Sequence, residues 1–207
     1  MLSALRAEPD PHTSVAERDY VDVHVADSLA GLAIEELRLA RRIADVGAGA
    51  GFPGLPLAVA LPAARVDLIE SARRKAAVIE RLVDSAGVSN AHVVAARAEE
   101  WAAGRGRGTY DAVCARAVGP LPLLVEYAAP LLRDGGVLIA WKGKRDRLDE
   151  SRGSRAASAT GLEPARVLAV EPYPGSRDRH LHLYRKVSPT PDRFPRRPGR
   201  AVKRPLH

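Results

Sequence analysis

The sequence predicts an α/β fold in which a seven-stranded, mostly parallel sheet ends in an antiparallel hairpin. From residue 43 onward, short apolar runs alternate with helical patterns, which is typical of a parallel sheet with helices on both faces. The last two strand-like runs follow each other through a short loop around Pro174 and Gly175, and a short loop joins antiparallel strands. The expected strands are 43–46, 66–70, 92–96, 111–116, 136–142, 165–173 and 180–186.

Helical patterns fill the gaps between these strands. The expected helices are 55–60, 73–86, 98–103, 120–132 and 148–160. Pro120 suits a first helical turn, and Gly87 and Gly135 suit the position just after a helix end. Ahead of the sheet, apolar residues recur at helical spacing within 17–40, whereas 1–16 are expected to be poorly structured or marginally helical.

Length and charge fit one domain with short appendages. The 207 residues are 46% hydrophobic, which is enough for a core. We expect a helical cap (1–40), a sheet domain (41–187) and a basic, proline-rich tail (188–207) in an extended conformation. The tail has six Lys or Arg and one Asp, so it carries +5 of the net charge of +7. Such a tail suits a polyanion, or it only improves solubility.

The composition also argues against several classes of protein. No apolar run is long enough to span a bilayer, and the amino-terminal residues lack the apolar segment of a signal peptide. The lone Cys114 cannot form an intrachain disulfide and fits a reducing compartment. We therefore expect a cytoplasmic protein without a membrane or metal site, with an inert Cys114 in the core. A monomer is favoured, although the sequence does not fix the oligomeric state.

A glycine-rich stretch, residues 45–54 (Asp-Val-Gly-Ala-Gly-Ala-Gly-Phe-Pro-Gly), directly follows the first strand. Alternating glycines let a ligand lie against bare backbone, and this place in an open α/β sheet binds adenosine-containing cofactors. From Gly49, the spacing is that of nicotinamide dinucleotide sites. From Gly47, with Asp45 before it, the pattern is that of S-adenosylmethionine (AdoMet) sites.

Several features favour AdoMet. Asp45 would contact the methionine moiety, directly or through water. Glu70 ends the second strand and would bind both ribose hydroxyls, although dinucleotide enzymes also place an acid there. Ala98 and Glu99 follow the third strand, where an adenine ring would lie. The closing antiparallel hairpin also points to a methyltransferase.

Each of these features has a plain structural alternative. The glycines could form only a tight turn, and Asp45 could cap the following helix. Glu70 could pair with Arg73 or Arg74. Residues 98–99 alone fit a simple helix start equally well.

Further short motifs occur in a characteristic order. They are 24–29 (His-Val-Ala-Asp-Ser-Leu), 45–54, 97–99 (Arg-Ala-Glu), 115–117 (Ala-Arg-Ala), 142–143 (Lys-Gly), 179–180 (Arg-His) and 194–199 (Phe-Pro-Arg-Arg-Pro-Gly). With them, roughly residues 20–207 resemble the RsmG (GidB) methyltransferases, which methylate guanine N7 in small-subunit (16S) ribosomal RNA. Many methyltransferases share the glycine turn, whereas its Phe-Pro-Gly continuation and the tail motif are more specific.

The resemblance implies a Rossmann-like, class I AdoMet-dependent methyltransferase. Its expected partner is 16S ribosomal RNA or a small-subunit assembly intermediate. By position, the AdoMet contacts of the family fall on Gly47, Phe52, Ala98, Glu99 and Arg116. Methyl transfer to a protein or small molecule, and non-catalytic RNA binding, are the alternative functions.

The expected chemistry needs no general base, because guanine N7 carries a lone pair and no proton. Catalysis then rests on positioning. We hypothesise that Arg116 and Lys142 lie at the pocket mouth and contact phosphate or guanine O6, with an ordinary ion pair as the alternative for each. His24 is expected to be structural, capping its own helix or bonding Asp27.

Overall fold

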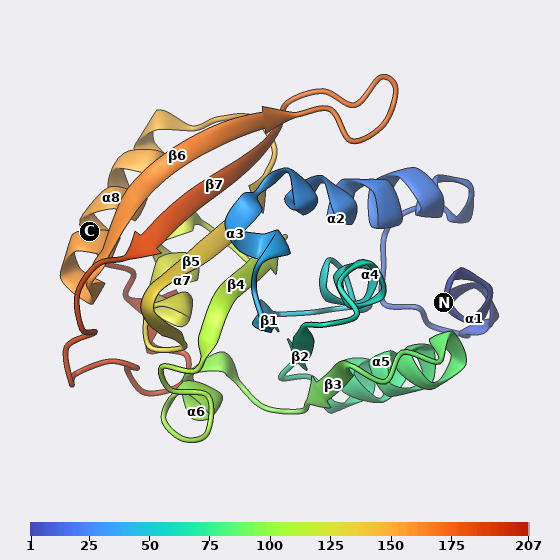
Figure 1. Cartoon of the computed structure of the whole chain (residues 1–207), viewed down its shortest axis with the longest axis horizontal. Helices are drawn as coiled ribbons and strands as arrows, with labels where there is room; N and C mark the ends of the chain where they lie inside the picture. Colours follow the sequence, from blue (N-terminus) through green and yellow to red (C-terminus); the bar gives the residue numbers. More distant parts are fainter. Residues whose placement is uncertain (207) are drawn as a thin grey trace.

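The computed structural model describes residues 1–206, and its centre is a seven-stranded sheet in the order β3-β2-β1-β4-β5-β7-β6 (Figure 1). Strands β1 to β5 are parallel to one another, whereas β7 is antiparallel to both β5 and β6. The predicted fold class is therefore confirmed. The strands are β1 (Arg42–Val46), β2 (Arg65–Ile69), β3 (Ala91–Val94), β4 (Tyr110–Arg116), β5 (Leu132–Lys142), β6 (Leu162–Val170) and β7 (Arg179–Lys186).

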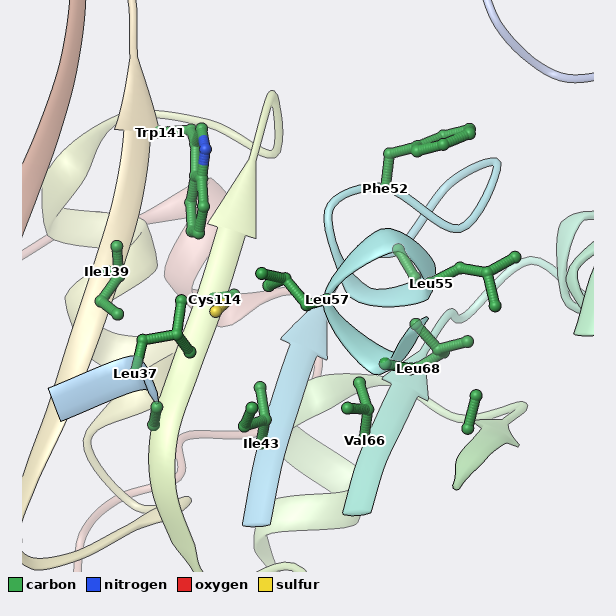
Figure 2. Packing of buried hydrophobic residues seen from close by; sticks show 14 of the residues in the cluster. Leu37, Ile43, Phe52, Leu55, Leu57, Val66, Leu68, Cys114, Ile139 and Trp141 are labelled. Atoms are coloured by element: carbon green, nitrogen blue, oxygen red, sulfur yellow. The ribbon is translucent and has the colours of Figure 1, made fainter. Parts of the chain in front are cut away.

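The central strands are mostly apolar because both faces of the sheet are covered. Successive side chains point to opposite faces, so Ile43 belongs to one buried cluster and Ala44 to the other. Figure 2 shows the first cluster, with Leu57 above Ile43 and Val66. Cys114 lies in the same cluster and is fully buried, and burial raises the pKa of its thiol, as expected for an inert core residue.

The helices between the strands are close to those predicted. They are α4 (Gly54–Ala60), α5 (Arg73–Ala86), α6 (Ala98–Ala102), α7 (Leu121–Ala128) and α8 (Arg147–Thr160). Gly87 follows α5 with φ +63°, as predicted. Two expectations were wrong. Helix α7 ends at Ala128, because Pro130 lacks the backbone N–H that would continue the helix, and Gly135 lies within β5.

The amino-terminal part is a series of short helical turns rather than one helix over 17–40. They are η1 (Glu17–Asp19), η2 (Tyr20–Ala26), α2 (Asp27–Leu29), η3 (Ala30–Ala33) and α3 (Glu35–Arg38). Before them, α1 (Leu2–Ala7) contacts α5 with Leu5 fully buried. Arg81 of α5 donates to both carboxylate oxygens of Glu8, at 2.7 and 2.6 Å. Residues 1–16 are therefore better packed than their sequence predicted.

The tail does not form the extended chain that its prolines predicted. It folds back onto the body, where Phe194 and Ala201 are buried, and it ends in the short helix α9 (Arg200–Lys203) against α7. Arg196 forms a two-pronged ion pair with the buried Glu126. These contacts override local preference because they bury apolar side chains and pair charges.

None of the helices within residues 1–206 has the length and apolar character required to cross a membrane. The division into cap, sheet domain and tail at residues 40 and 187 stays a prediction.

Candidate functional site

A cavity of about 630 Å³ lies at the carboxyl ends of β1, β4 and β5. In open α/β sheets, ligands bind at this edge. The cavity is lined by the glycine turn, by the ends of the strands and by an amino-terminal segment; the predicted residues among its lining are Gly47, Gly49, Phe52, Glu70, Arg116 and Lys142. The structure thus brings six of the nine predicted site residues into one cavity wall.

The glycine turn adopts a backbone shape that only glycine enters readily. Gly47, Gly49 and Gly51 have φ values of +70°, +61° and +91°. The amides of Gly47 and Ala48 both donate to the Ile69 carbonyl, at 2.9 and 3.1 Å, which fixes the turn to the end of β2. A Cβ on Gly47 would lie only 2.6 Å from a methyl group of Val118. The glycines therefore leave bare backbone on the cavity wall, as the sequence predicted.

The Glu70 carboxylate is held in the cavity wall by two backbone amides. Its Oε2 accepts from Gly49 at 3.1 Å and its Oε1 accepts from Ala72 at 2.8 Å. Within the described residues, Glu70 forms no ion pair with Arg73 or Arg74. Each oxygen retains a lone pair for another donor, which fits the predicted role of binding ribose hydroxyls.

Asp45 is fully buried below the turn rather than in the cavity lining. Its Oδ2 accepts from the Gly54 amide at 2.8 Å at the start of α4, which supports the helix-cap alternative. Its Oδ1 has no hydrogen-bond partner in the described part of the chain. Burial raises the pKa of Asp45 to about 7, against the opposing effects of the Gly54 amide and Arg116. An unpaired buried carboxylate next to a cavity fits a cationic ligand.

Replacing Asp45 by Asn should change how stability depends on pH. The raised pKa means that the native state keeps a proton that the unfolded chain releases above its own pKa of about 3.8. The stabilisation by this group is therefore complete below that pH and is lost as pH rises through about 7.

An asparagine side chain at this position would be neutral throughout this range. Relative to wild type, Asp45→Asn should gain on the order of 4 kcal/mol in unfolding free energy between pH 4 and pH 8. Denaturant titrations of both proteins at several pH values measure this. A constant difference between them would show that Asp45 is ionised in the native state from pH 4 upward.

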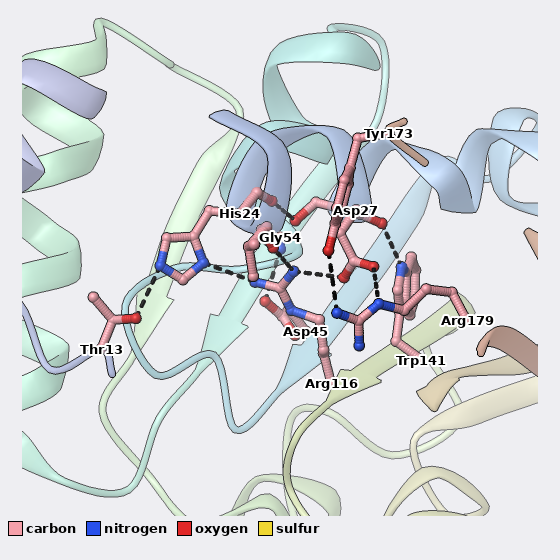
Figure 3. Close-up of polar contacts among 11 residues, drawn as sticks. Thr13, His24, Asp27, Asp45, Gly54, Arg116, Trp141, Tyr173 and Arg179 are labelled. Atoms are coloured by element: carbon pink, nitrogen blue, oxygen red, sulfur yellow. Dashed lines mark hydrogen bonds and ion pairs between the residues drawn. The ribbon is translucent and has the colours of Figure 1, made fainter. Parts of the chain in front are cut away.

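Arg116 joins the end of β4 to the helical cap (Figure 3). One guanidinium nitrogen, Nη1, donates to the Val23 carbonyl at 2.9 Å and to Asp27 Oδ2 at 2.8 Å. The other, Nη2, lies 3.3 Å from His24 Nδ1. Only the Nε hydrogen and one Nη2 hydrogen remain for a ligand. The ion-pair alternative is therefore present, although Arg116 also lines the cavity.

Lys142, like Arg116, both lines the cavity and bonds to other parts of the protein. It lines the cavity, yet its Nζ donates to the Gly119 carbonyl and pairs with Asp149 Oδ2, both at 3.1 Å. These bonds hold the loop after β4 against the start of α8. The third ammonium hydrogen remains for a ligand.

His24 of η2 packs against the glycine turn. Its ring stacks on Phe52 with centroids 4.2 Å apart and planes 6° apart. Burial, together with the charge of Arg116, lowers the pKa of His24 to about 4, so the ring is neutral at pH 7. The expectation of a structural His24 is met, but its partners are Arg116 and Thr13 rather than Asp27.

Ala98 and Glu99 do not line the cavity. Both are buried at the start of α6, and Glu99 Oε1 accepts the Gly199 amide of the tail at 2.9 Å. In this structure Glu99 anchors the tail, and its contact with a cofactor stays a prediction.

Sequence reasoning assigned no site role to several lining residues, namely Thr13, Asp27, Arg179 and His180. Arg179 donates to the Tyr173 hydroxyl at 3.1 Å, and its Nε lies 3.9 Å from Asp27 Oδ1 (Figure 3). The His-x-x-Asp and Arg-His motifs marked three of these residues without indicating what they do. Thr13 lies in a stretch without a recognisable motif.

The chain matches one family over most of its length. Residues 13–181 match the family described as rRNA small subunit methyltransferase G (GidB). The chain belongs to this family. The family resemblance predicted from sequence, and with it the prediction of a methyltransferase, is confirmed.

Curated relatives carry the same description. The chain is 44% identical over 187 residues to the ribosomal RNA small subunit methyltransferase G of Rubrobacter xylanophilus, covering 88% of this chain and 72% of that relative. It is 40% identical to the protein of the same description from Deinococcus radiodurans, covering 100% of this chain and 83% of the relative.

Solved structures with the same fold include a predicted methyltransferase and a protein bound to S-adenosylmethionine. A predicted O-methyltransferase from Agrobacterium tumefaciens is 26% identical with a TM-score of 0.61, over 79% of this chain and 81% of that one. A variant of the protein MtNAS, solved with S-adenosylmethionine, matches with a TM-score of 0.60 at 18% identity, over 78% of this chain and 62% of that one.

Proposed function

We propose that this GidB-family protein transfers a methyl group from AdoMet to N7 of a guanine in small-subunit (16S) ribosomal RNA. One observation carries the proposal. The chain belongs to a family of small-subunit ribosomal RNA methyltransferases, and its glycine turn and Glu70 face the same cavity as Arg116 and Lys142.

The residues present fit AdoMet. The bare backbone at Gly47 and Gly49 gives room for the nucleoside, and the fixed Glu70 carboxylate has lone pairs for its ribose hydroxyls. The unpaired oxygen of Asp45 suits a positive charge in the methionine moiety, directly or through water. Ala98 and Glu99 are the proposed boundary of the adenine site.

When bound, AdoMet supplies a methyl group on a positively charged sulfur. The protein needs no base, because N7 attacks with its own lone pair. Two groups that could otherwise act as base or nucleophile are occupied: both His24 nitrogens are hydrogen-bonded and the Cys114 thiol is buried. The proposed work of the site is positioning and exclusion of water, which supplies on the order of 7–11 kcal/mol in well-oriented reactions.

Arg116 and Lys142 are the proposed catalytic residues. Their internal bonds hold each cation still at the cavity wall, so the remaining N–H groups are already oriented for guanine O6 or a phosphate oxygen. Fixed donors cost no reorganisation when the substrate arrives.

The folded tail offers the RNA a preformed positive surface. Arg197, Arg200, Lys203 and Arg204 are exposed, and none forms an ion pair among residues 1–206. If these four cations meet phosphates of single-stranded RNA, changing all four to Gln should reduce the slope of log affinity against log salt by about 3. The change keeps Phe194 and Arg196, which anchor the tail. An unchanged slope would show that the RNA phosphates do not contact these four side chains.

Transfer of tritium from labelled AdoMet tests the function. The acceptors are ribosomal RNA and small subunits from cells that lack this gene, followed by mapping of the modified base. The proposal predicts label at N7 of one guanine in 16S RNA. Label in protein would support the alternative function, and no label in any acceptor would contradict enzymatic methylation. The proposed setting is the cytoplasm, with the protein acting as a monomer.

A further inference from the structure

Residues 12–15, from the amino-terminal segment, form part of the cavity wall, although the sequence assigned them no role. On one side, α1 is fixed to α5 through Leu5 and the pair of Glu8 with Arg81. On the other side, Thr13 is hydrogen-bonded to His24 of η2. The segment thus crosses from α5 to η2 beside the glycine turn.

The hydrogen-bonding pattern fixes the direction of the Thr13 contact. A guanidinium only donates, so His24 Nδ1 must accept from Arg116. The neutral ring then carries its hydrogen on Nε2, which donates to Thr13 Oγ1 at 2.9 Å (Figure 3).

The Thr13 oxygen is also bonded to the backbone. The amide of Val15 donates to the same Oγ1 at 3.2 Å. Both lone pairs of the hydroxyl are therefore used, and its hydrogen meets no acceptor within residues 1–206. A donor held by two bonds on a cavity wall is well placed for an acceptor atom of a ligand.

The contact is connected to the rest of the site. The same His24 ring stacks on Phe52 of the glycine turn and bonds Arg116 at the end of β4. Movement of Thr13 away from His24 would release residues 12–15. It would also free the His24 ring, which supports the side chains of Phe52 and Arg116.

We propose that Thr13 is a cofactor-binding residue: it holds residues 12–15 over the cavity through His24 and donates its hydroxyl hydrogen to an acceptor atom of bound AdoMet. The proposal rests on the proposed use of AdoMet and extends it to a residue outside the methyltransferase sheet.

The test is binding of S-adenosylhomocysteine, the product form of the cofactor, to full-length variants by calorimetry and stopped flow. Thr13→Val removes the hydroxyl while keeping the shape. It should weaken binding about 2- to 12-fold, which corresponds to the loss of one hydrogen bond, and should speed dissociation. Thr13→Ser restores the hydroxyl and should bind within about twofold of wild type, a smaller change than the loss of a hydrogen bond.

Thr109→Val is the matched control. Thr109 donates its hydroxyl to the Gly106 carbonyl outside the cavity lining, so its loss should leave binding unchanged. Wild-type affinity in Thr13→Val would overturn the role of Thr13, as would equal weakening in all three variants. Absence of binding by folded wild type would instead contradict the use of AdoMet.

Discussion

Replacing Gly47 by Ala is expected to weaken binding of S-adenosylhomocysteine by at least about tenfold, about 1.4 kcal/mol. A Cβ at Gly47 would approach a Val118 methyl group to 2.6 Å, and φ of +70° disfavours any L side chain. Val118 lines the cavity, so its displacement changes the cavity wall itself. Calorimetric titration at 25 °C measures the loss.

Gly87→Ala separates backbone strain from the clash. Gly87 has φ of +63°, but a Cβ there would meet nothing within 4 Å. Both variants should lose about 1–2 kcal/mol of stability from the left-handed conformation, and only Gly47→Ala should lose affinity. Adding Val118→Ala to Gly47→Ala should restore part of the lost affinity. Equal affinities in the two single variants would show that the turn does not contact the cofactor.

Replacing Arg116 by Ala is expected to lower methyl transfer by more than about 100-fold, as loss of a fixed catalytic donor does. The change also removes the nearer of the two cations beside Asp27 and leaves only Arg179, whose Nε lies 3.9 Å from Oδ1. The Arg116 and Asp27 side chains are only 15% and 11% exposed, so stability should fall as well, by at most about 3–5 kcal/mol.

A second variant separates catalysis from folding. Arg116→Ala combined with Asp27→Asn leaves no unpaired carboxylate, so most of the stability should return while methyl transfer stays low. Circular dichroism melts and single-turnover rates with saturating RNA measure both. If the rate of methyl transfer recovered together with stability in the double variant, the role of Arg116 would be only that of a structural ion-pair partner.

The fold was predictable because each strand and helix leaves a local pattern of apolar residues in the sequence, and these patterns alternate regularly. The strands are mostly apolar runs such as 43–46, in which Asp45 is the one polar residue, since both faces of the sheet are buried. The hairpin is set by the short loop before Arg179. The ends of elements were less predictable. The early end of α7 follows from Pro130, although the apolar pattern continues past it. The folded tail depends on contacts between distant residues, such as Arg196 with Glu126.

The candidate site was predictable to the same extent. Gly47 and Glu70 directly follow β1 and β2, and Arg116 is the last residue of β4, so their meeting at one edge follows from topology. The partners that fix them were not predictable. Asp27 reaches Arg116 from 89 residues away, and no local pattern reports such a contact. For the same reason, sequence spacing could not show that Glu99 bonds the tail amide of Gly199.

Direct titration tests whether the glycine turn after β1 binds AdoMet. AdoMet and S-adenosylhomocysteine are titrated into the folded, full-length protein by calorimetry, with NAD as the comparison. We expect saturable binding of both sulfur nucleosides at a single site and no binding of NAD. Absence of binding of either sulfur nucleoside to protein that melts cooperatively would contradict this expectation.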